Sequence, residues 1–459
     1  MNINEIINIP FDQALTILSE YSKDKDSNIP ANREAYDGKH AILADTNRLP
    51  KSVGDDAKNK RIVTPTNEVI TFQKRIVDSA VEFLFGAPVS LILNNDENDA
   101  YDLITEIWKQ NKLDYFNKKL ARDLFIECKA AELWYIPQGD DIRIRVALLS
   151  ARTGYNLYPH FDEFGDMDAF TIKYTTKDKE GKTVDTVSVY TADKIINATK
   201  KTGNDWNKEE RPNTLGKIPV VYYEQDKPEW DGVSTEINRA EYLLSNFADT
   251  NDYFGSPVLQ VKGIVTNLPR KEEMGKVVMV QPEHDADGKV YYPGGAEFVT
   301  WDQAPEALKT EYEILKDIIY SMTQTPDLSF QNVKGISSLS GVALRLMFSD
   351  SLFKARGKQE IFGPAMERRL SIIKSILGLT NSSQSKSIDS ADIDAVFNDV
   401  LPQDIQALVA SLSVARGGEA IMSEESAVRM NPLVTDPEKD IGLLSGEKSA
   451  LKSFAESYA

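Results

Sequence analysis

The sequence has few residues suited to catalysis or metal binding, with one cysteine and three histidines among 459 residues. A lone cysteine, Cys128, forms no intrachain disulfide and fits a reducing cytoplasm. It falls on the apolar side of a predicted helix and no histidine lies near it, so a core role is favoured over a catalytic thiol. His40, His160 and His284 are far apart and form no HExxH or CxxC pattern. We therefore expect no metal and no cofactor.

Other motifs and runs are also missing. No GxxxxGK phosphate loop occurs, which excludes a nucleotide-driven motor of that type. No run of 18 apolar residues exists, so we expect no membrane-spanning helix and no membrane partner. The start, MNINEIINIP, has no basic and apolar signal-peptide pattern. The acidic pair Asp140–Asp141 and the DADG run at 285–288 are better explained as solvated turns than as a catalytic pair or a calcium loop. We expect no enzymatic activity.

The chain has fewer basic than acidic residues: 53 Lys and Arg and 71 Asp and Glu give it a net charge of −18. A protein that grips nucleic acid through its phosphates needs basic patches. The acidity argues against such a protein but is compatible with one that lets a polyanion pass without sticking. The hydrophobic content of 41% and charged content of 27% are ordinary for soluble protein and allow two or three domains.

The first half of the chain predicts helices followed by a sheet. Amphipathic spacing predicts helices over Phe11–Tyr21, Asn67–Phe85, Asp99–Asn111 and Leu113–Cys128, with a strand in PVSLILN. From Ala131 to Tyr223 apolar and polar residues alternate with a period of two, which predicts strands. The strand patterns are ELWYI, IRIRVALL, DAFTIKYTT, DTVSVYTA and IPVVYYE. Short glycine turns between them favour an antiparallel meander. We expect one α+β domain.

Two helices then flank a small insert. The two helices are predicted over Thr235–Phe254, with an N-cap at Ser234, and over Gln303–Gln324. Each has a narrow apolar seam. Each has a net charge of −3, where Asp302 is counted with the second helix. Residues 255–301 between them contain strand patterns and a hairpin signal at Asp287–Gly288. The helices are expected to pack antiparallel and to raise the insert on a stalk.

A polar loop, TPDLSFQNVKGISS (Thr325–Ser338), follows the second helix. After it, a helix of some 40 residues, about 60 Å long, is predicted over Leu339–Leu379, with a kink at Gly363–Pro364. Its net charge is +4, and neutralisation by acidic neighbours is favoured over contact with DNA. A polar linker leads to helices at Pro402–Ala415 and Ser423–Met430.

Several runs, taken in this order, resemble the tailed-bacteriophage portal proteins of the siphophage type, the head-to-tail connector rings. They are EAYDGKHAIL, KNKRIVTPTNEVITFQKRIVDSAVEFLFGAPVSL, AEYLLSNFADTNDYFGSPVLQVKG, SSLSGVALRLMF, FNDVLPQDIQALVASL, MSEESAVRM and VTDPEKD. The resemblance implies an α+β multidomain subunit. Its parts would be a wing (1–233), stem helices (234–254 and 302–324) around a clip (255–301), a tunnel loop (325–338), a long wing helix and linker (339–400) and a crown (401–459).

The resemblance also implies a virion protein, assembled in the host cytoplasm as a homo-oligomeric ring of about twelve subunits at one capsid vertex. Double-stranded DNA would pass through it during packaging and ejection. The implied partners are the terminase motor, the major capsid and scaffold proteins, and the head-completion or adaptor proteins.

The expected site is a channel. Duplex DNA carries one charge per ~1.7 Å of axis, so a basic wall would stall it, whereas an acidic stem repels it and a polar loop can follow its backbone. The predicted tunnel-loop residues are Asp327, Ser329, Phe330, Gln331, Asn332, Val333, Lys334, Gly335 and Ser337. The predicted acidic wall of the stem consists of Glu236, Glu241, Asp249, Asp252, Glu306, Glu313 and Asp317. The alternative is a structural ring or adaptor of a virus particle that conducts no DNA, in which such a loop has no purpose.

Overall fold

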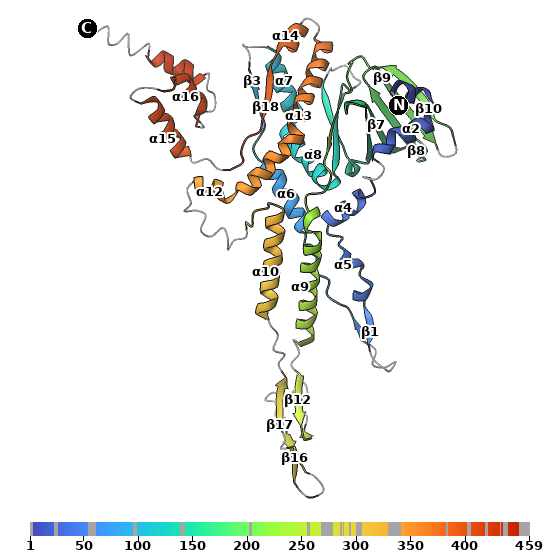
Figure 1. The fold of residues 1–459 in the computed structure, drawn as a ribbon, viewed down its shortest axis with the longest axis vertical. Helices are drawn as coiled ribbons and strands as arrows, with labels where there is room; N and C mark the ends of the chain where they lie inside the picture. Colours follow the sequence, from blue (N-terminus) through green and yellow to red (C-terminus); the bar gives the residue numbers. More distant parts are fainter. Residues whose placement is uncertain are drawn as a thin grey trace, which may run out of the picture.

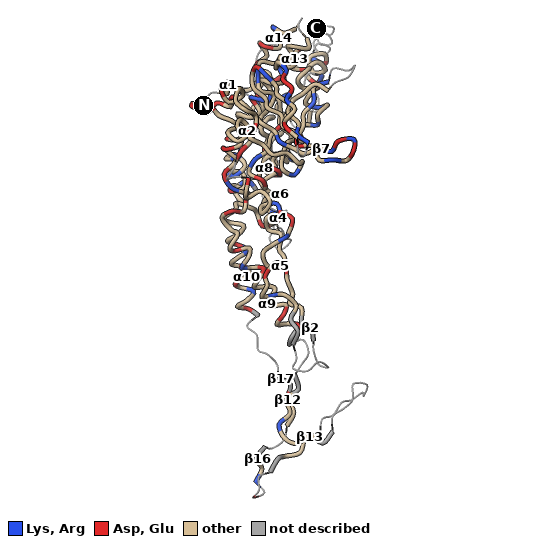
Figure 2. Tube along the Cα trace, turned by 90° about the vertical axis from the view of Figure 1, so that its right-hand side faces the viewer, with Lys and Arg blue, Asp and Glu red and all other residues tan. Residues whose placement is uncertain are grey.

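The computed structural model is elongated, with a broad body above, a two-helix stem below it and a slender β-stranded insert at the far end (Figures 1 and 2). The structure describes residues 3–22, 26–53, 61–94, 99–137, 143–201, 204–254, 258–267, 279–284, 287, 289–292, 295–299, 305–328, 341–381, 384–401, 405–417, 421–431, 433–434 and 439–448.

The main core lies in the body, between helices and a three-stranded antiparallel sheet of order β11-β4-β5. Apolar residues at helical spacing, such as Ile76, Val77 and Ala80, turn one face of α6 into this core. The long helix α13 adds Phe362, Met366 and Ile373, so distant parts of the chain share one core. The elements are α4 (Ile29–Tyr36), α6 (Phe72–Phe85), α7 (Asp99–Gln110), α8 (Leu113–Glu127), β4 (Lys129–Tyr135), β5 (Arg145–Leu149), β11 (Val220–Glu224) and α13 (Ser349–Thr380).

A second sheet is a five-stranded antiparallel meander, of order β10-β9-β8-β7-β6. Gly165 and Gly181 adopt positive φ in two of its turns, as tight hairpins require. Helices α1 and α2 cover one part of the meander, and a separate apolar cluster joins it to the smaller sheet. The elements are α1 (Ile3–Asn8), α2 (Phe11–Ser19), η1 (Glu20–Ser22), η3 (Ala151–Thr153), β6 (Tyr155–Phe161), β7 (Met167–Lys177), β8 (Thr183–Thr191), β9 (Lys194–Lys201) and β10 (Asn207–Pro212).

The body confirms the α+β class and the antiparallel meander but differs from the sequence prediction in detail. The predicted sheet region, Ala131–Tyr223, forms two sheets rather than one, and β6, β9 and β10 were not predicted. Helix α6 begins at Phe72 rather than at Asn67, because the main chain before it is bound along another helix, as described below. The strand in PVSLILN is β3 (Ser90–Leu93), and it pairs with β18 (Ile393–Val396) just after the predicted linker.

The stem is the antiparallel helix pair α9 (Ser234–Phe254) and α10 (Pro305–Met322), as predicted (Figure 1). Ser234 is not the N-cap, since η4 (Asp231–Val233) precedes it and its hydroxyl donates to the Trp230 carbonyl. Antiparallel pairs form the insert, among them β15–β16 at the predicted hairpin. Its strands are β12 (Val258–Lys262), β13 (Ile264–Asn267), β14 (Met279–Gln281), β15 (Glu283–His284), β16 (Val290–Tyr292) and β17 (Gly295–Val299).

A segment beside the stem has no counterpart in the sequence prediction. Residues 40–50, here called the strap, contain α5 (Ala41–Ala44) and η2 (Thr46–Arg48) and run along α9 on the side away from α10 (Figure 1). The strap leads into a hairpin of β1 (Lys51–Val53) and β2 (Arg61–Val63).

The predicted 40-residue helix is interrupted. It consists of α12 (Gly341–Met347) and α13, which are separated at Phe348, while Pro364 lies inside the continuous α13. The chain continues through α14 (Ser385–Ser390) to α15 (Ile405–Arg416) and α16 (Glu424–Met430). These last two confirm the predicted C-terminal helices, and the Ser423 hydroxyl accepts from the Ser426 amide at the start of α16.

Candidate functional site

The stem meets the body where α10 ends. Ile319 of α10 is fully buried in the main core, and Gln324, with φ of 52°, ends the helix in the left-handed region. Asp327 lies beyond this end of the helix and pairs with Lys316, inside α10, at 2.9 Å. The pairing raises the pKa of Lys316. Of the residues predicted to form the site in the loop, the structure describes Asp327; Ser329, Phe330, Gln331, Asn332, Val333, Lys334, Gly335 and Ser337 lie outside the described residues.

Helix α13 binds this end of the stem through its first turns. The Ser351 hydroxyl donates to the Gln324 carbonyl at 2.8 Å, and the Lys354 ammonium donates to the Thr323 carbonyl at 2.9 Å. These bonds satisfy carbonyls that have no partner within α10. The end of α10, where the predicted loop begins, is thus tied directly to α13.

A buried carboxylate joins the same helix to the segment that enters the stem. Glu229, just before η4, accepts from Lys354 at 2.8 Å and also pairs with Lys358. Burial alone would raise the pKa of Glu229, but the two lysines hold it below its ordinary value. Glu229, Lys354 and Lys358 are here called the junction triad. They connect the start of α9 and the end of α10, which lie at the same end of the stem, to α13.

The basic residues of α13 are largely used inside the subunit. Arg369 is fully buried and donates to both carboxylate oxygens of Glu132, at 2.9 and 2.7 Å. The neighbouring Arg368 donates to the main-chain carbonyl of Val220. With the junction triad, these contacts confirm neutralisation by acidic neighbours for Lys354, Lys358 and Arg369, although Arg356 stays exposed.

Four of the predicted wall residues are exposed acids on the stem. Glu306, Glu313 and Asp317 are spaced so that they share one face of α10, and Asp252 is exposed near the far end of α9. Figure 2 shows acidic residues along this part of the tube. Glu236 is half-buried and accepts from the Thr235 hydroxyl at 2.9 Å.

Glu241 and Asp249 do not belong to an exposed wall, which corrects the sequence prediction. Glu241 is completely buried and accepts from His40 Nδ1 and from the Ile70 amide. Asp249 pairs with Arg48 at 2.6 Å and accepts from the Thr66 amide. Their charges are therefore directed at residues 40–70 rather than at solvent.

Further polar contacts between these two segments anchor the strap to α9. The Tyr242 hydroxyl donates to Asp45, the Ser245 hydroxyl accepts from the Glu68 amide, and Arg48 also donates to Asn246. We call this set of bonds the clasp. The sequence contained a signal for a polar contact surface on α9, because Glu241, Ser245 and Asp249 follow one another at intervals of four residues and so share a face of the helix.

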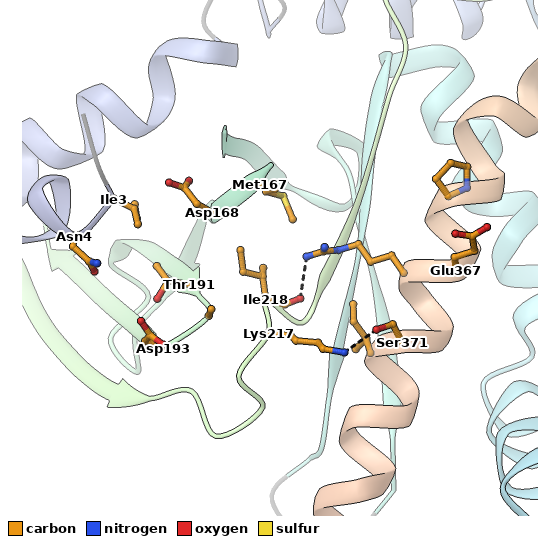
Figure 3. A pocket seen from close by; sticks show the side chains of 14 residues that line it. Ile3, Asn4, Met167, Asp168, Thr191, Asp193, Lys217, Ile218, Glu367 and Ser371 are labelled. Atoms are coloured by element: carbon orange, nitrogen blue, oxygen red, sulfur yellow. Dashed lines mark hydrogen bonds between the residues drawn. The ribbon is translucent and has the colours of Figure 1, made fainter. Parts of the chain in front are cut away.

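A cavity of about 630 Å³ lies in the body, between α1, the meander and α13 (Figure 3). Three of its charged residues have internal partners: Lys217 donates to the Ser371 hydroxyl, Arg368 donates to the Ile218 carbonyl, and Asp168 pairs with His160. The cavity mixes both signs of charge, and nothing in its lining pairs a nucleophile with a base.

Cys128 ends α8 with φ of 65° rather than lying within the helix. Burial, and to a smaller extent Glu229, raises the pKa of its thiol to about 12, so the thiol stays protonated at neutral pH. Over the described residues, no three His, Cys, Asp or Glu side chains gather as metal ligands. Within the same residues, no helix is long and apolar enough to cross a membrane.

A known protein family matches the chain in sequence. The sequence matches the family model described as "Phage portal protein, SPP1 Gp6-like" over residues 17–453. No curated protein matches the sequence. Among solved structures, a chain of "Virion of native gene transfer agent (GTA) particle" is similar, with a TM-score of 0.39 and 10% identity, over 85% of this chain and 97% of that chain.

Proposed function

Because the chain belongs to the SPP1 Gp6-like family of phage portal proteins, we propose that its stem and loop form a DNA channel. Membership of this family implies a structural virion component that assembles as a ring. The proposal adds that about twelve subunits surround the channel at one capsid vertex. Double-stranded DNA passes through it during packaging and ejection, and the ring joins head to tail.

The parts of the subunit take the family's roles in this proposal. Residues 1–233 with 339–400 form the wing, 234–254 and 302–324 the stem, 255–301 the clip and 401–459 the crown. Residues 325–338 are the tunnel loop. The ring would meet the terminase motor, the major capsid and scaffold proteins, and head-completion or adaptor proteins.

The channel proposal rests on the arrangement of residues along α10 and at its end. Glu306, Glu313 and Asp317 are exposed along the helix that leads into the loop, and α13 is bound to the same end. Repeated around a ring, these acids repel phosphates and prevent the DNA from binding in one register. The loop beyond them then provides the close contact, which suits a gate.

A deletion of Gln331–Ser337 tests this function. We expect rings of normal diameter, because the anchors at Thr323, Gln324 and Ser351 are intact, but no packaged DNA. Electron microscopy of the purified protein would count rings with an open centre, and nuclease-protected DNA would measure packaging into heads.

The matched control is the triple replacement Ser329→Gly, Ser337→Gly and Ser338→Gly, which keeps the loop length and should package normally. Normal packaging by the deletion variant would contradict a gate and favour a ring that needs no loop. Loss of rings would show that the loop is structural instead.

A further inference from the structure

The stem helix α10 has an apolar ridge that is not covered by the part of the chain that the structure describes. Ile314, Ile318 and Met322 follow one another at intervals of four residues, and their exposed fractions are 54%, 36% and 71%. Ile319, on the side that faces α9 and the core, is completely buried. Single exposed apolar residues are common, but three in a row on one helix indicate a surface that another chain covers.

A second apolar surface lies on the opposite flank of the stem. The strap exposes Leu43 and Leu49, at 48% and 51%. Figure 1 shows α5, which contains Leu43, on one side of α9, with α10 on the other side at the same height. Helix α9 therefore separates the elements that carry the two surfaces within one subunit.

The clasp holds the strap in position for such a contact. Six residues of α9 and the strap bind through side chains that are partly or fully buried: His40, Asp45, Arg48, Glu241, Tyr242 and Asp249. A segment fixed in this way loses little conformational entropy on binding, so it can present its leucines as a rigid surface.

The charges of the two flanks are also complementary. Residues 39–50 include two basic residues and one acidic residue, whereas α10 has four acidic residues and two basic ones. Asp317 follows Ile314 at an interval of three residues, so negative charge borders the ridge. Complementary charge at the edge of an apolar patch selects a partner and its orientation.

We propose that the strap of one subunit covers the α10 ridge of its neighbour, with Leu43 against Ile314 and Ile318. Because the two surfaces are different and lie on opposite flanks, the contact is heterologous, and its repetition by rotation generates a ring. This inference rests on the proposed ring and names the contact that closes it. It gives the N-terminal strap a role in assembly rather than in contact with DNA.

Cross-linking between two introduced cysteines tests the contact. In a Cys128→Ser background, the variant Leu43→Cys with Ile314→Cys is assembled and treated with a short bismaleimide. A heterologous contact joins each subunit to the next, so denaturing gels should show a ladder of dimers, trimers and higher species. The single-cysteine variants should show no ladder. The control pair is Leu43→Cys with Phe164→Cys, since Phe164 is 84% exposed but lies at a hairpin of the body.

A charge test uses the same positions. Leu43→Glu and Ile314→Glu should each raise the subunit concentration needed for half-assembly by about tenfold. Leu43→Lys combined with Ile314→Glu should recover part of that loss. Rings in the electron microscope without a ladder would overturn the strap contact and leave the channel proposal standing. Absence of rings from the unaltered protein would overturn the proposed function, and this contact with it.

Discussion

His40 is enclosed by two hydrogen-bond acceptors, a carboxylate and a carbonyl. Its Nδ1 faces Glu241, and its Nε2 lies 2.7 Å from the Ala35 carbonyl oxygen. Both ring nitrogens must donate, so the geometry selects the imidazolium form. The hydrogen bond to Glu241 raises the pKa of His40, although burial opposes it. The strap is therefore held to α9 by a buried charged pair.

This pair predicts a dependence of stability on pH. A raised pKa means that the folded state binds the proton more tightly, so the stabilisation is complete below the ordinary histidine pKa of about 6.5. It is lost as the pH rises through the higher folded pKa, and it amounts to about 1.4 kcal/mol for every pH unit that separates the folded pKa from the unfolded one. Urea unfolding between pH 6 and 9 should show this decline in the unaltered protein, and His40→Gln should flatten it.

Glu241→Gln should flatten the same decline, because it removes the partner of the imidazolium. The matched control is Glu313→Gln, an exposed acid of the stem, which should leave the decline unchanged. If the stability of His40→Gln still declined fully with pH, a group other than this charged pair would cause the decline.

At the scale of elements, the junction triad is the contact that determines how α13 meets the stem. The side chains of Lys354 and Lys358 are 11% and 20% exposed and that of Glu229 is 3% exposed, so the carboxylate has little access to other partners. Glu229→Gln keeps the volume but leaves two lysines without their counter-charge. We expect a loss of about 3 kcal/mol, at the low end for a broken buried pair because water reaches the lysines.

Hydrogen exchange would locate this effect. Amides in the first turns of α13, over Ser349–Lys358, should lose protection in Glu229→Gln, since they open together with the junction. Glu360→Gln, an exposed acid of the same helix, is the control and should change neither exchange nor stability. Unchanged protection in Glu229→Gln would mean that the apolar contacts of α13 hold the junction alone.

The same elements show what the sequence could and could not predict. The stem pair was predictable because seam spacing is a local property, and Ile237 and Ile319 are buried as the seams required, although the predicted N-cap at Ser234 was wrong. The spacing of Glu241 and Asp249 showed that they share a face of α9, but it could not show their partners, because these lie about two hundred residues away along the chain. The interruption at Phe348 was also missed, since no proline or glycine stands there to mark it.

On the scale of the whole molecule, stability is concentrated in the body. The buried clusters draw on the helices, both sheets of the body and the base of the stem, and none of their members comes from the described residues of the insert. The insert connects to the rest through the far ends of α9 and α10 (Figure 1). Its two-stranded pairs bury little and contribute little to the fold of the body.

Replacing residues 255–304 with a short Gly-Ser linker should therefore leave the melting temperature of the subunit within about 2 °C of the original. The body and the base of the stem keep every buried contact, and joining α9 to α10 directly preserves their antiparallel pairing. Calorimetry would measure the transition, with Ile319→Ala as the control for a lost core contact, expected to cost about 2–5 kcal/mol. A fall of more than about 5 °C in the linker variant would show that the insert stabilises the stem, and that the stem is not held from the body alone.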